Sequence, residues 1–201
     1  ALAVRASLAQ HCCHPVREIR QSAVAHLQKL LMKTGPGDVD VVELFERVLF
    51  PLADDLARPD ISRLDGAIED TQMAAASMLC KVFLNRFAGP PLVVDGVATD
   101  LLVSLFSGLL TRLLAFLRFR SDALREGVPE SVKNVLLVLK TQGLLAPGAA
   151  LWTATWRLVD PVLPDLKPDL FPDLYSAADK GTANGMAAAS VPSSPSAIHF
   201  V

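Results

Sequence analysis

Four consecutive residues near the start of the chain, His11-Cys12-Cys13-His14, have side chains that can bind metal ions. A tetrahedral zinc site needs ligands that converge on one point, usually from two separated pairs. Four contiguous side chains point in different directions, so we interpret this stretch as a partly buried helix end. The chain has three cysteines, two of them adjacent, which argues against a disulfide framework and favours a reducing compartment, cytosol or nucleus.

The other residues that could support catalysis are isolated from one another. Cys80 lies on an apolar stripe and is predicted to be a small core residue, whereas His26 is predicted to lie at the surface. Asp54-Asp55 is typical of a solvated helix face, and Glu69-Asp70 of a helix start. Gly35-Pro36-Gly37 lacks the Lys-Ser/Thr of a phosphate-binding loop, and the sequence has no G-x-S-x-G. We therefore expect no catalytic residue, no metal ion and no cofactor.

Two groups of side chains are candidates for contact with a partner. Four arginines form a loose basic cluster that is either a solvated face or a site for an acidic partner or phospholipid headgroup. Two tryptophans four residues apart are either core or groove aromatics or part of a partner pocket, since exposed Trp often anchors interfaces. These candidate residues are Arg112, Arg118, Arg120, Arg125, Trp152 and Trp156. The net charge of −2 creates no overall field for nucleic acid, so none is expected as a partner.

These residues must be positioned by helices. The chain is 51% hydrophobic, with a mean hydropathy of +0.37, and its apolar residues are mostly Leu, Val and Ala. No convincing run alternates apolar and polar residues with a period of two, as a half-buried strand would. About seven helices are expected, at 1–12, 16–33, from a cap at Asp38 or Asp40 to 56, and at 68–87, 97–120, 129–142 and 149–163.

Two of these helices show informative patterns. In the helix at 16–33, one stripe is predicted to face the core, and Arg17, Glu18, Arg20, Gln21 and Lys29 are predicted to lie elsewhere. The stripe consists of Val16, Ile19, Ala23, Leu27, Leu30 and Leu31. The helix at 97–120 is apolar on nearly every side, which predicts a central position. It is not interpreted as a membrane span, because Arg112 lies in its middle.

The spacing of apolar residues repeats between helices. Residues 23, 27 and 30 correspond to 76, 80 and 83, and these to 132, 136 and 139, with offsets of 76 − 23 = 53 and 132 − 76 = 56. Pro51 lies inside one intervening helix, where it should remove a backbone bond and bend the axis. The pattern predicts an all-α fold of stacked HEAT/armadillo-like helical pairs, an α-solenoid, over 1–175. The Ala/Ser/Pro/Gly-rich residues 176–201 are predicted to be a tail or linker.

Four stretches resemble one protein family: 44–52 (LFERVLFPL), 79–84 (LCKVFL), 124–138 (LREGVPESVKNVLLV) and 151–156 (LWTATW). They are similar to the C-terminal helical region of the large Golgi-type Arf guanine-nucleotide exchange factors, the brefeldin-A-resistance class. The resemblance points to a fungal source. The similarity spans about 16–166. Because the chain begins with Ala1 inside an apparent helix, we expect it to be a piece of a larger protein.

The resemblance implies a non-catalytic, regulatory domain, since the family's catalytic glutamate lies in another domain whose signature is absent from this sequence. It implies partners among small GTPases of the Arf/Rab type and other domains of the same parent protein. It also implies possible peripheral membrane contact, a cytoplasmic location at Golgi membranes, and a homodimeric parent. The alternative is a HEAT-type scaffold outside trafficking, and an enzyme that uses Cys80 or His26 is a distant third.

Overall fold

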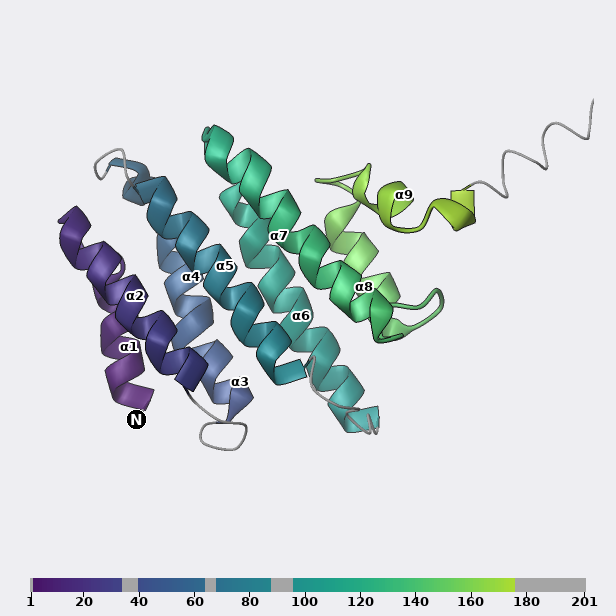
Figure 1. The fold of residues 1–201 in the computed structure, drawn as a ribbon, viewed down its shortest axis with the longest axis horizontal. Helices are drawn as coiled ribbons and strands as arrows, with labels where there is room; N and C mark the ends of the chain where they lie inside the picture. The colour runs from purple at the N-terminus through teal and green to yellow at the C-terminus, as the bar shows by residue number, and fades with distance from the viewer. Residues whose placement is uncertain (1, 34–39, 64–67, 88–95, 176–201) are drawn as a thin grey trace, which may run out of the picture. The chain divides into compact units, whose positions relative to one another are not determined.

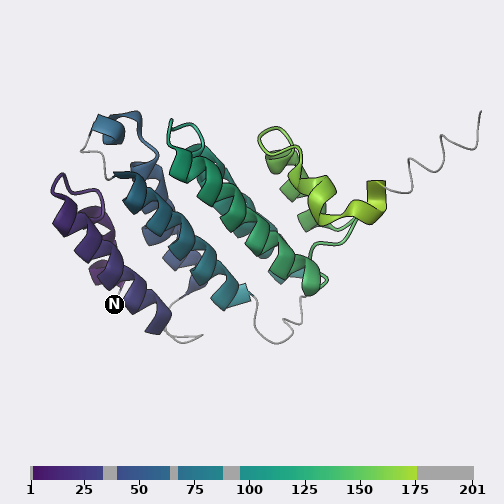
Figure 2. The ribbon, with the colours of Figure 1, turned by 45° about the horizontal axis from the view of Figure 1, so that its top comes forward.

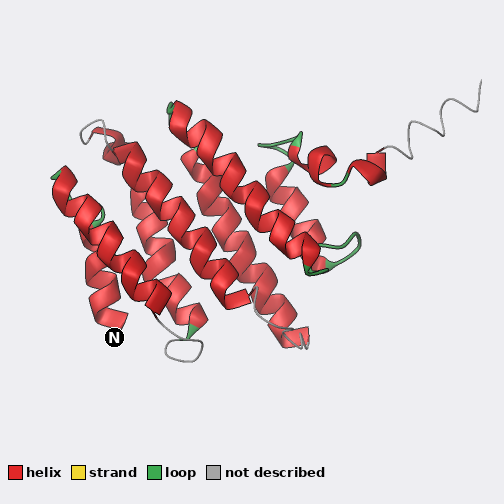
Figure 3. Cartoon of the chain, in the orientation of Figure 1, coloured by secondary structure: helices red, strands yellow, loops and turns green. Residues whose placement is uncertain are grey.

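The computed structural model describes residues 2–33, 40–63, 68–87 and 96–175. The predicted cap at Asp38 and the predicted tail at 176–201 lie outside these residues. The chain divides into two compact units, Ala1–Leu166 and Lys167–Val201. Every regular element in the described residues is helical, as expected from the sequence (Figure 3).

The first unit consists of helices stacked in pairs. The helices are α1 (Leu2–His11), α2 (Arg17–Lys33), α3 (Val41–Leu44), a π-helical segment (Phe45–Leu49), α4 (Phe50–Leu56), a 3₁₀ turn (Pro59–Arg63), α5 (Ile68–Phe87), α6 (Gly96–Phe116), α7 (Asp122–Thr141) and α8 (Ala150–Val159). One layer contains α2, α5 and α7 side by side, and the other contains α1, the run from α3 to α4, α6 and α8 (Figures 1 and 2). The predicted helical stack is therefore confirmed.

Helix α5 begins and ends where the sequence predicts, and its stripe lies in the core. Ala76 and Phe83 are fully buried, and Cys80 nearly so. The corresponding residues of the other two helices, Ala23 and Val132, are also buried. The positions three and four residues apart are thus the sides on which neighbouring helices pack.

The prediction for α2 was partly wrong. Val16, Ile19 and Leu30 are exposed, whereas Arg20, predicted to lie away from the core, is completely buried. Its Nη1 donates to the carbonyls of His14 and Pro15, at 3.0 and 2.8 Å, and its Nε donates to Thr71 Oγ1 at 3.4 Å. Those acceptors compensate for removing the guanidinium from water, so an apparently polar position becomes part of the core.

Pro51 is accommodated by a local change of helix type. Asp40 caps the run, since its carboxylate accepts hydrogen bonds from the amides of Val42 and Glu43 at 2.7 and 3.3 Å. The π-helical segment then precedes Pro51, and the Phe50 amide donates to the Phe45 carbonyl five residues back. A proline ring clashes with the carbonyl four residues back in a regular helix, and a widened turn relieves that clash.

Three other helix boundaries differ from the prediction. Helix α7 begins at Asp122 rather than near Pro129, because Ser121 Oγ caps it by accepting from the Leu124 amide at 3.4 Å. Gly143 ends α7 as predicted, with a φ of 73°. Helices α6 and α8 end earlier than expected, at Phe116 and Val159. A short helix that was not among those expected, α9 (Leu166–Leu170), follows α8 in the sequence.

The central position predicted for the long apolar helix is confirmed for α6, which packs against α4, α5, α7 and α8. It is long and apolar enough to cross a membrane by length and composition. Its small and polar stripe faces outward, with Ser104 and Thr111 exposed. Since its apolar sides pack against four helices, we interpret α6 as a core helix of the stack.

Candidate functional site

The structure separates Arg112 from the rest of the predicted basic cluster. Its Nη2 pairs with Asp54 Oδ2 at 2.8 Å, and its Nη1 donates to the Gly108 carbonyl at 3.1 Å. The guanidinium also lies over the Phe50 ring, 4.0 Å from the ring centre. A side chain with these contacts joins α6 to α4, and it is not presented to a partner.

Gly108 makes this arrangement possible. A Cβ atom at this position would lie 2.7 Å from Cζ of Phe50, closer than real carbon contacts. The lack of a side chain at residue 108 leaves room for the Phe50 ring to lie against α6 under the Arg112 guanidinium.

The other three arginines lie at the turn that joins α6 to α7. Arg118, Arg120 and Arg125 are all exposed. Arg125 pairs with Asp122 at 3.8 Å, and both side chains are largely in water, so this pair contributes little stability. The described residues show no ion pair for Arg118 or Arg120. Of the four arginines singled out from the sequence, those two are exposed and have no ion pair within the described residues.

The two tryptophans differ in exposure. Trp156 is buried, whereas Trp152 is half-buried, and their rings meet edge to face with centroids 5.4 Å apart. Trp156 is therefore a core residue of α8, and it is not an accessible anchor. Only Trp152 keeps a surface that a partner could contact.

A small groove lies between the C-terminal ends of α6 and α8 and the residues that directly follow them. Its volume is about 290 Å³, and its lining is mainly apolar: Thr111, Leu114, Ala115, Leu117, Arg118, Leu158 and Val162. We call it the α6–α8 groove. Of the six residues singled out from the sequence, only Arg118 lines it. The structure therefore combines one predicted cation with apolar residues that sequence reasoning did not assign to a site.

A larger groove, which the sequence did not predict, lies between α1 and α2. Its volume is about 700 Å³, and we call it the α1–α2 groove. Ile19 lines it, although the sequence placed Ile19 on the core stripe. The missed signal is Arg20: had it been assigned to the interior, Ile19 on the adjacent face would have been expected at the surface.

The metal-binding residue types at 11–14 do not converge. His11 Nδ1 lies 2.7 Å from the Ser7 carbonyl, Cys12 Sγ donates to the Leu8 carbonyl, and His14 Nδ1 accepts from the Val16 amide. Across the described residues, no three His, Cys, Asp or Glu side chains are placed to hold a metal ion.

Burial makes the three thiols poor nucleophiles. It raises the pKa of Cys12 and of Cys80 to about 12, and at Cys12 the neighbouring Cys13 raises the pKa further. Burial also raises the pKa of Cys13 to about 11, together with the nearby Asp55 carboxylate and against Arg58 and Arg20. Because the thiolate is the reactive form, none of these cysteines has the environment of a catalytic one.

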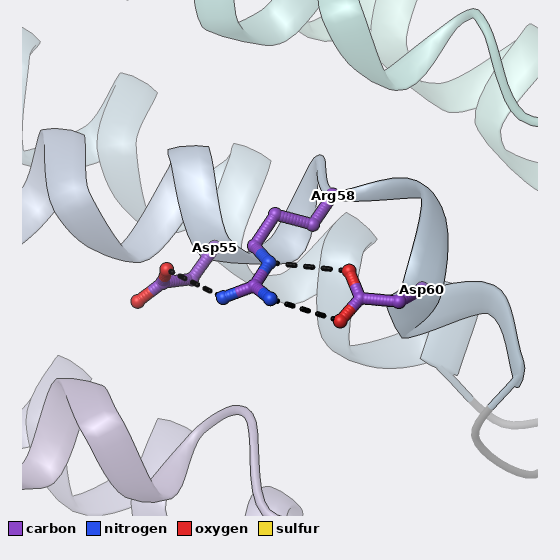
Figure 4. A network of polar contacts seen from close by, with 3 residues as sticks. All are labelled: Asp55, Arg58 and Asp60. Carbon is purple, nitrogen blue, oxygen red and sulfur yellow. Dashed lines mark hydrogen bonds and ion pairs between the residues drawn. The ribbon is translucent and has the colours of Figure 1, made fainter.

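An exposed network of charges follows α4 (Figure 4). Arg58 donates to both carboxylate oxygens of Asp60, at 3.1 and 2.9 Å, and lies 4.0 Å from Asp55. Asp54, beside it, is occupied by Arg112. The carboxylates at 54 and 55 are thus each paired with an arginine, as expected of a solvated helix face rather than of a general acid and base.

Comparison with known proteins identifies relatives for most of the chain. A family model described as GBF1-like, tetratrico peptide repeat region, matches residues 1–166. The chain is 31% identical over 179 residues to ARF guanine-nucleotide exchange factor GNOM of Arabidopsis thaliana, covering 77% of this chain and 11% of that protein. It is 31% identical over 159 residues to the Golgi-specific brefeldin A-resistance guanine nucleotide exchange factor 1 homolog of Caenorhabditis elegans, covering 77% and 8%.

A third relative is ARF guanine-nucleotide exchange factor GNL1 of Arabidopsis thaliana, 27% identical over 179 residues, covering 80% of this chain and 12% of that protein. This chain therefore spans only about a tenth of the length of the curated relatives it matches. No solved structure matches it. The resemblance to Golgi-type exchange factors is confirmed, and the fungal source stays a prediction.

Proposed function

Because the chain belongs to the family of GBF1-like tetratricopeptide repeat regions of Golgi-type Arf guanine-nucleotide exchange factors, we propose that it is a non-catalytic regulatory and targeting module of such a protein. In this role it contributes to membrane recruitment and to regulation by small GTPases. The observation that carries the proposal is the family match over 1–166, a range that contains the helices that stack in pairs, α1 to α8. A stack of this kind works by presenting surfaces.

The partners follow from this role. They are small GTPases of the Arf/Rab type and other domains of the parent protein, with peripheral contact at Golgi membranes and a homodimeric parent. The α6–α8 groove supports a protein partner, because an apolar floor beside the cationic Arg118 suits a surface with apolar anchors and a carboxylate.

A flotation assay tests the proposal. The chain is mixed with liposomes of Golgi-like composition, with GTP-loaded or GDP-loaded Arf or Rab anchored on them. We expect recruitment with a GTP-loaded GTPase and little without it. Recruitment to none of these surfaces would contradict targeting by this module.

Charge reversal locates the contact. The double variant Arg118→Glu with Arg120→Glu should weaken recruitment about tenfold or more, a loss of about 1.4 kcal/mol. The matched control is Lys29→Glu with Lys81→Glu, which makes the same change in net charge at exposed residues of α2 and α5. Equal losses in the two variants would mean that net charge, and not this turn, determines recruitment.

A further inference from the structure

The α6–α8 groove lies where two neighbouring helices of one layer end (Figure 1). One side of the groove comes from residues between 111 and 118 of α6 and the turn after it, and the other from Leu158 and Val162 at the end of α8. In a helical stack each pair contacts only its neighbours. A further pair beyond α8 would pack on the far side of α8, so the opening of this groove does not depend on how many pairs follow.

The size of the groove suits one or two side chains rather than a small molecule. Its volume of about 290 Å³ is just below the range of about 300–1,000 Å³ for small-molecule sites. Along α6 it extends from Thr111 to Arg118, about two helical turns or about 10 Å. Side chains four residues apart form a ridge on a helix, and such ridges pack into the grooves of other helices. The length therefore fits one ridge of two side chains.

The lining of the groove is continuous and apolar on both sides. Leu114 is buried, Leu117 and Leu158 are half-buried, and Val162 is 44% exposed. A single exposed valine needs no explanation. Val162, however, lines the same groove as Leu117 and Leu158, so an aliphatic side chain placed there would meet apolar atoms from both helices.

The charge of the lining is positive and lies at one end. Among the described lining residues Arg118 is the only charged one, and the described residues show no ion pair for it. A cation just after a helix is favourable in itself, so this position alone does not indicate a ligand. Thr111, at the other end, donates its hydroxyl hydrogen to the Ser107 carbonyl at 2.8 Å. Charge complementarity thus calls for a carboxylate at the Arg118 end.

The helix dipoles determine the direction of a bound helix. Helix α6 ends at Phe116 and α8 at Val159, so both present C-terminal ends at the Arg118 end of the groove. A helix carries partial negative charge at its C-terminus and partial positive charge at its N-terminus. A helix that lies antiparallel to α6 and α8 therefore brings its positive end here. Acidic residues are favourable in a first helical turn, so the carboxylate beside Arg118 also suits its own helix.

The small area of this contact favours an occupant from the same molecule. Specific interfaces between separate proteins bury at least about 1,000 Å², more than one ridge in this groove provides. A segment tethered in the same molecule has an effective concentration in the millimolar range, so a weak contact is sufficient. The chain covers 8–12% of the length of its three curated relatives, so most of such a protein lies outside it.

We propose that the α6–α8 groove binds one amphipathic helix from another part of the parent protein. Asp or Glu in the first turn of that helix pairs with Arg118, and two aliphatic residues four apart, the first of them one turn after the acid, fill the apolar lining. The inference rests on the proposed function, in which other domains of the parent protein are partners. It adds the chemistry and the direction of the bound helix.

Two peptides of about 15 residues, enough for four helical turns, test the direction. One has Glu before its two leucines, and the other has the same residues in reverse order. Backbone amide shifts of the ¹⁵N-labelled whole chain report binding by NMR. We expect shifts at Ala115, Arg118 and Val162, a Kd of about 1 mM or below for the acid-first peptide, and at least about fivefold weaker binding of the reversed one. Equal affinity, or no shifts at about 5 mM, would overturn the proposal.

Variants test the contacts. Arg118→Gln should remove the preference for the acid-first peptide, and a preference that survives would contradict the pairing with Arg118. Val162→Glu should abolish binding of this peptide. The matched control is Ile19→Glu, at a 38% exposed aliphatic residue of α2. An equal loss in the control would overturn the assignment to α6 and α8, provided that circular dichroism shows unchanged helicity in each variant.

The source of the helix is tested with overlapping 15-residue peptides that cover the rest of the parent protein. We expect at least one acid-first peptide to bind the chain and to lose binding with Arg118→Glu. The absence of any such peptide would overturn the proposed source, as would self-association in sedimentation that Val162→Glu abolishes, since a second copy would then occupy the groove. The flotation assay is separate, because it measures recruitment by a membrane-anchored GTPase, so either result can fail without the other.

Discussion

Helices α2 and α5 are neighbours in one layer with matching registers, yet they bury very different shares of their residues. In α5 eleven of 20 residues are buried, and in α2 five of 17. Helix α5 lies between α2 and α7 and also packs against α4 and α6, whereas α2 has α5 on one side and the open groove on the other. The number of covered sides accounts for the difference, since both helices are amphipathic.

The comparison teaches where stability and function lie in such a stack. A helix covered on several sides supplies buried area, and each large-to-small change there leaves a cavity. A helix covered on fewer sides, as α2 is in this chain, supplies less buried area and therefore contributes less to stability. We therefore expect the largest mutational effects in α5 and the smallest on the groove face of α2.

The largest effect is expected from Phe83→Ala in α5. Phe83 is fully buried and meets the rings of Phe45, Phe87 and Phe106 at centroid distances of 6.3, 4.8 and 5.2 Å. Its loss should lower the free energy of unfolding by about 3–5 kcal/mol. Urea titration followed by circular dichroism measures this. The companion change Ile19→Ala in α2 should cost less than about 1 kcal/mol. Similar losses in the free energy of unfolding from Phe83→Ala and Ile19→Ala would contradict the comparison between α5 and α2.

Exchanging one residue between the corresponding faces of α2 and α5 sharpens this comparison. Leu79→His should lower the free energy of unfolding by about 3 kcal/mol, because an imidazole then replaces a fully buried leucine where no hydrogen-bond partner is arranged for it. The reverse change, His26→Leu, should alter stability by less than about 0.5 kcal/mol, since His26 is exposed. Thermal unfolding of the two variants side by side provides the measurement. A large loss from His26→Leu would mean that the groove face is already covered.

Two arginines in α2 test the corrected face assignment. Arg20→Ala should cost about 2 kcal/mol, because it removes hydrogen bonds from a buried cation to the His14 and Pro15 carbonyls. Arg17→Ala should cost less than about 0.5 kcal/mol, since its pair with Asp70 is about half exposed on each side. Chemical denaturation compares them. If Arg17 proved the costlier loss, the face assignment would be wrong.

The cysteines give a pH-dependent comparison. Burial raises the pKa of Cys80 from 9.0 to about 12 in the folded chain, so folding favours its thiol. The stability it supports is complete below pH 9 and is lost as the pH rises from about 9 to about 12. At pH 8, iodoacetamide should modify the half-buried Cys13 before Cys80. Mass spectrometry of the modified peptides checks this order, and faster labelling of Cys80 would contradict it.

Much of the fold could be predicted from local pattern. In residues 68–87, apolar residues recur every three or four positions, as they do along one side of a helix, and α5 has those bounds. The buried Ala23, Ala76 and Val132 were likewise predicted, because a stripe must face a neighbour. The start of α7 at Asp122, capped by Ser121, was missed, since Pro129 is favourable at a helix start and gave the stronger local signal.

The candidate site was harder to predict, because it depends on contacts distant in sequence. Arg112 appeared free until the structure placed Asp54 and Phe50 beside it, 58 and 62 positions away. Arg20 is charged and therefore of a type usually found at the surface. In the structure it is buried, and it donates hydrogen bonds to the carbonyls of His14 and Pro15 in the preceding turn. The α1–α2 groove depends on how two separate helices pack against each other, which the periodicity within one helix does not specify, so it could not be read from the sequence.

Hydrogen exchange of the isolated chain tests the central claim most directly, that α5 is covered on several sides and the α1–α2 pair on one. The account predicts that amides in the middle of α5, around Ala76 and Cys80, exchange only through global unfolding. Amides of α1 should exchange about 100-fold faster through local opening. Equal protection in α1 and α5 would contradict the claim, because it would show that the two regions open together.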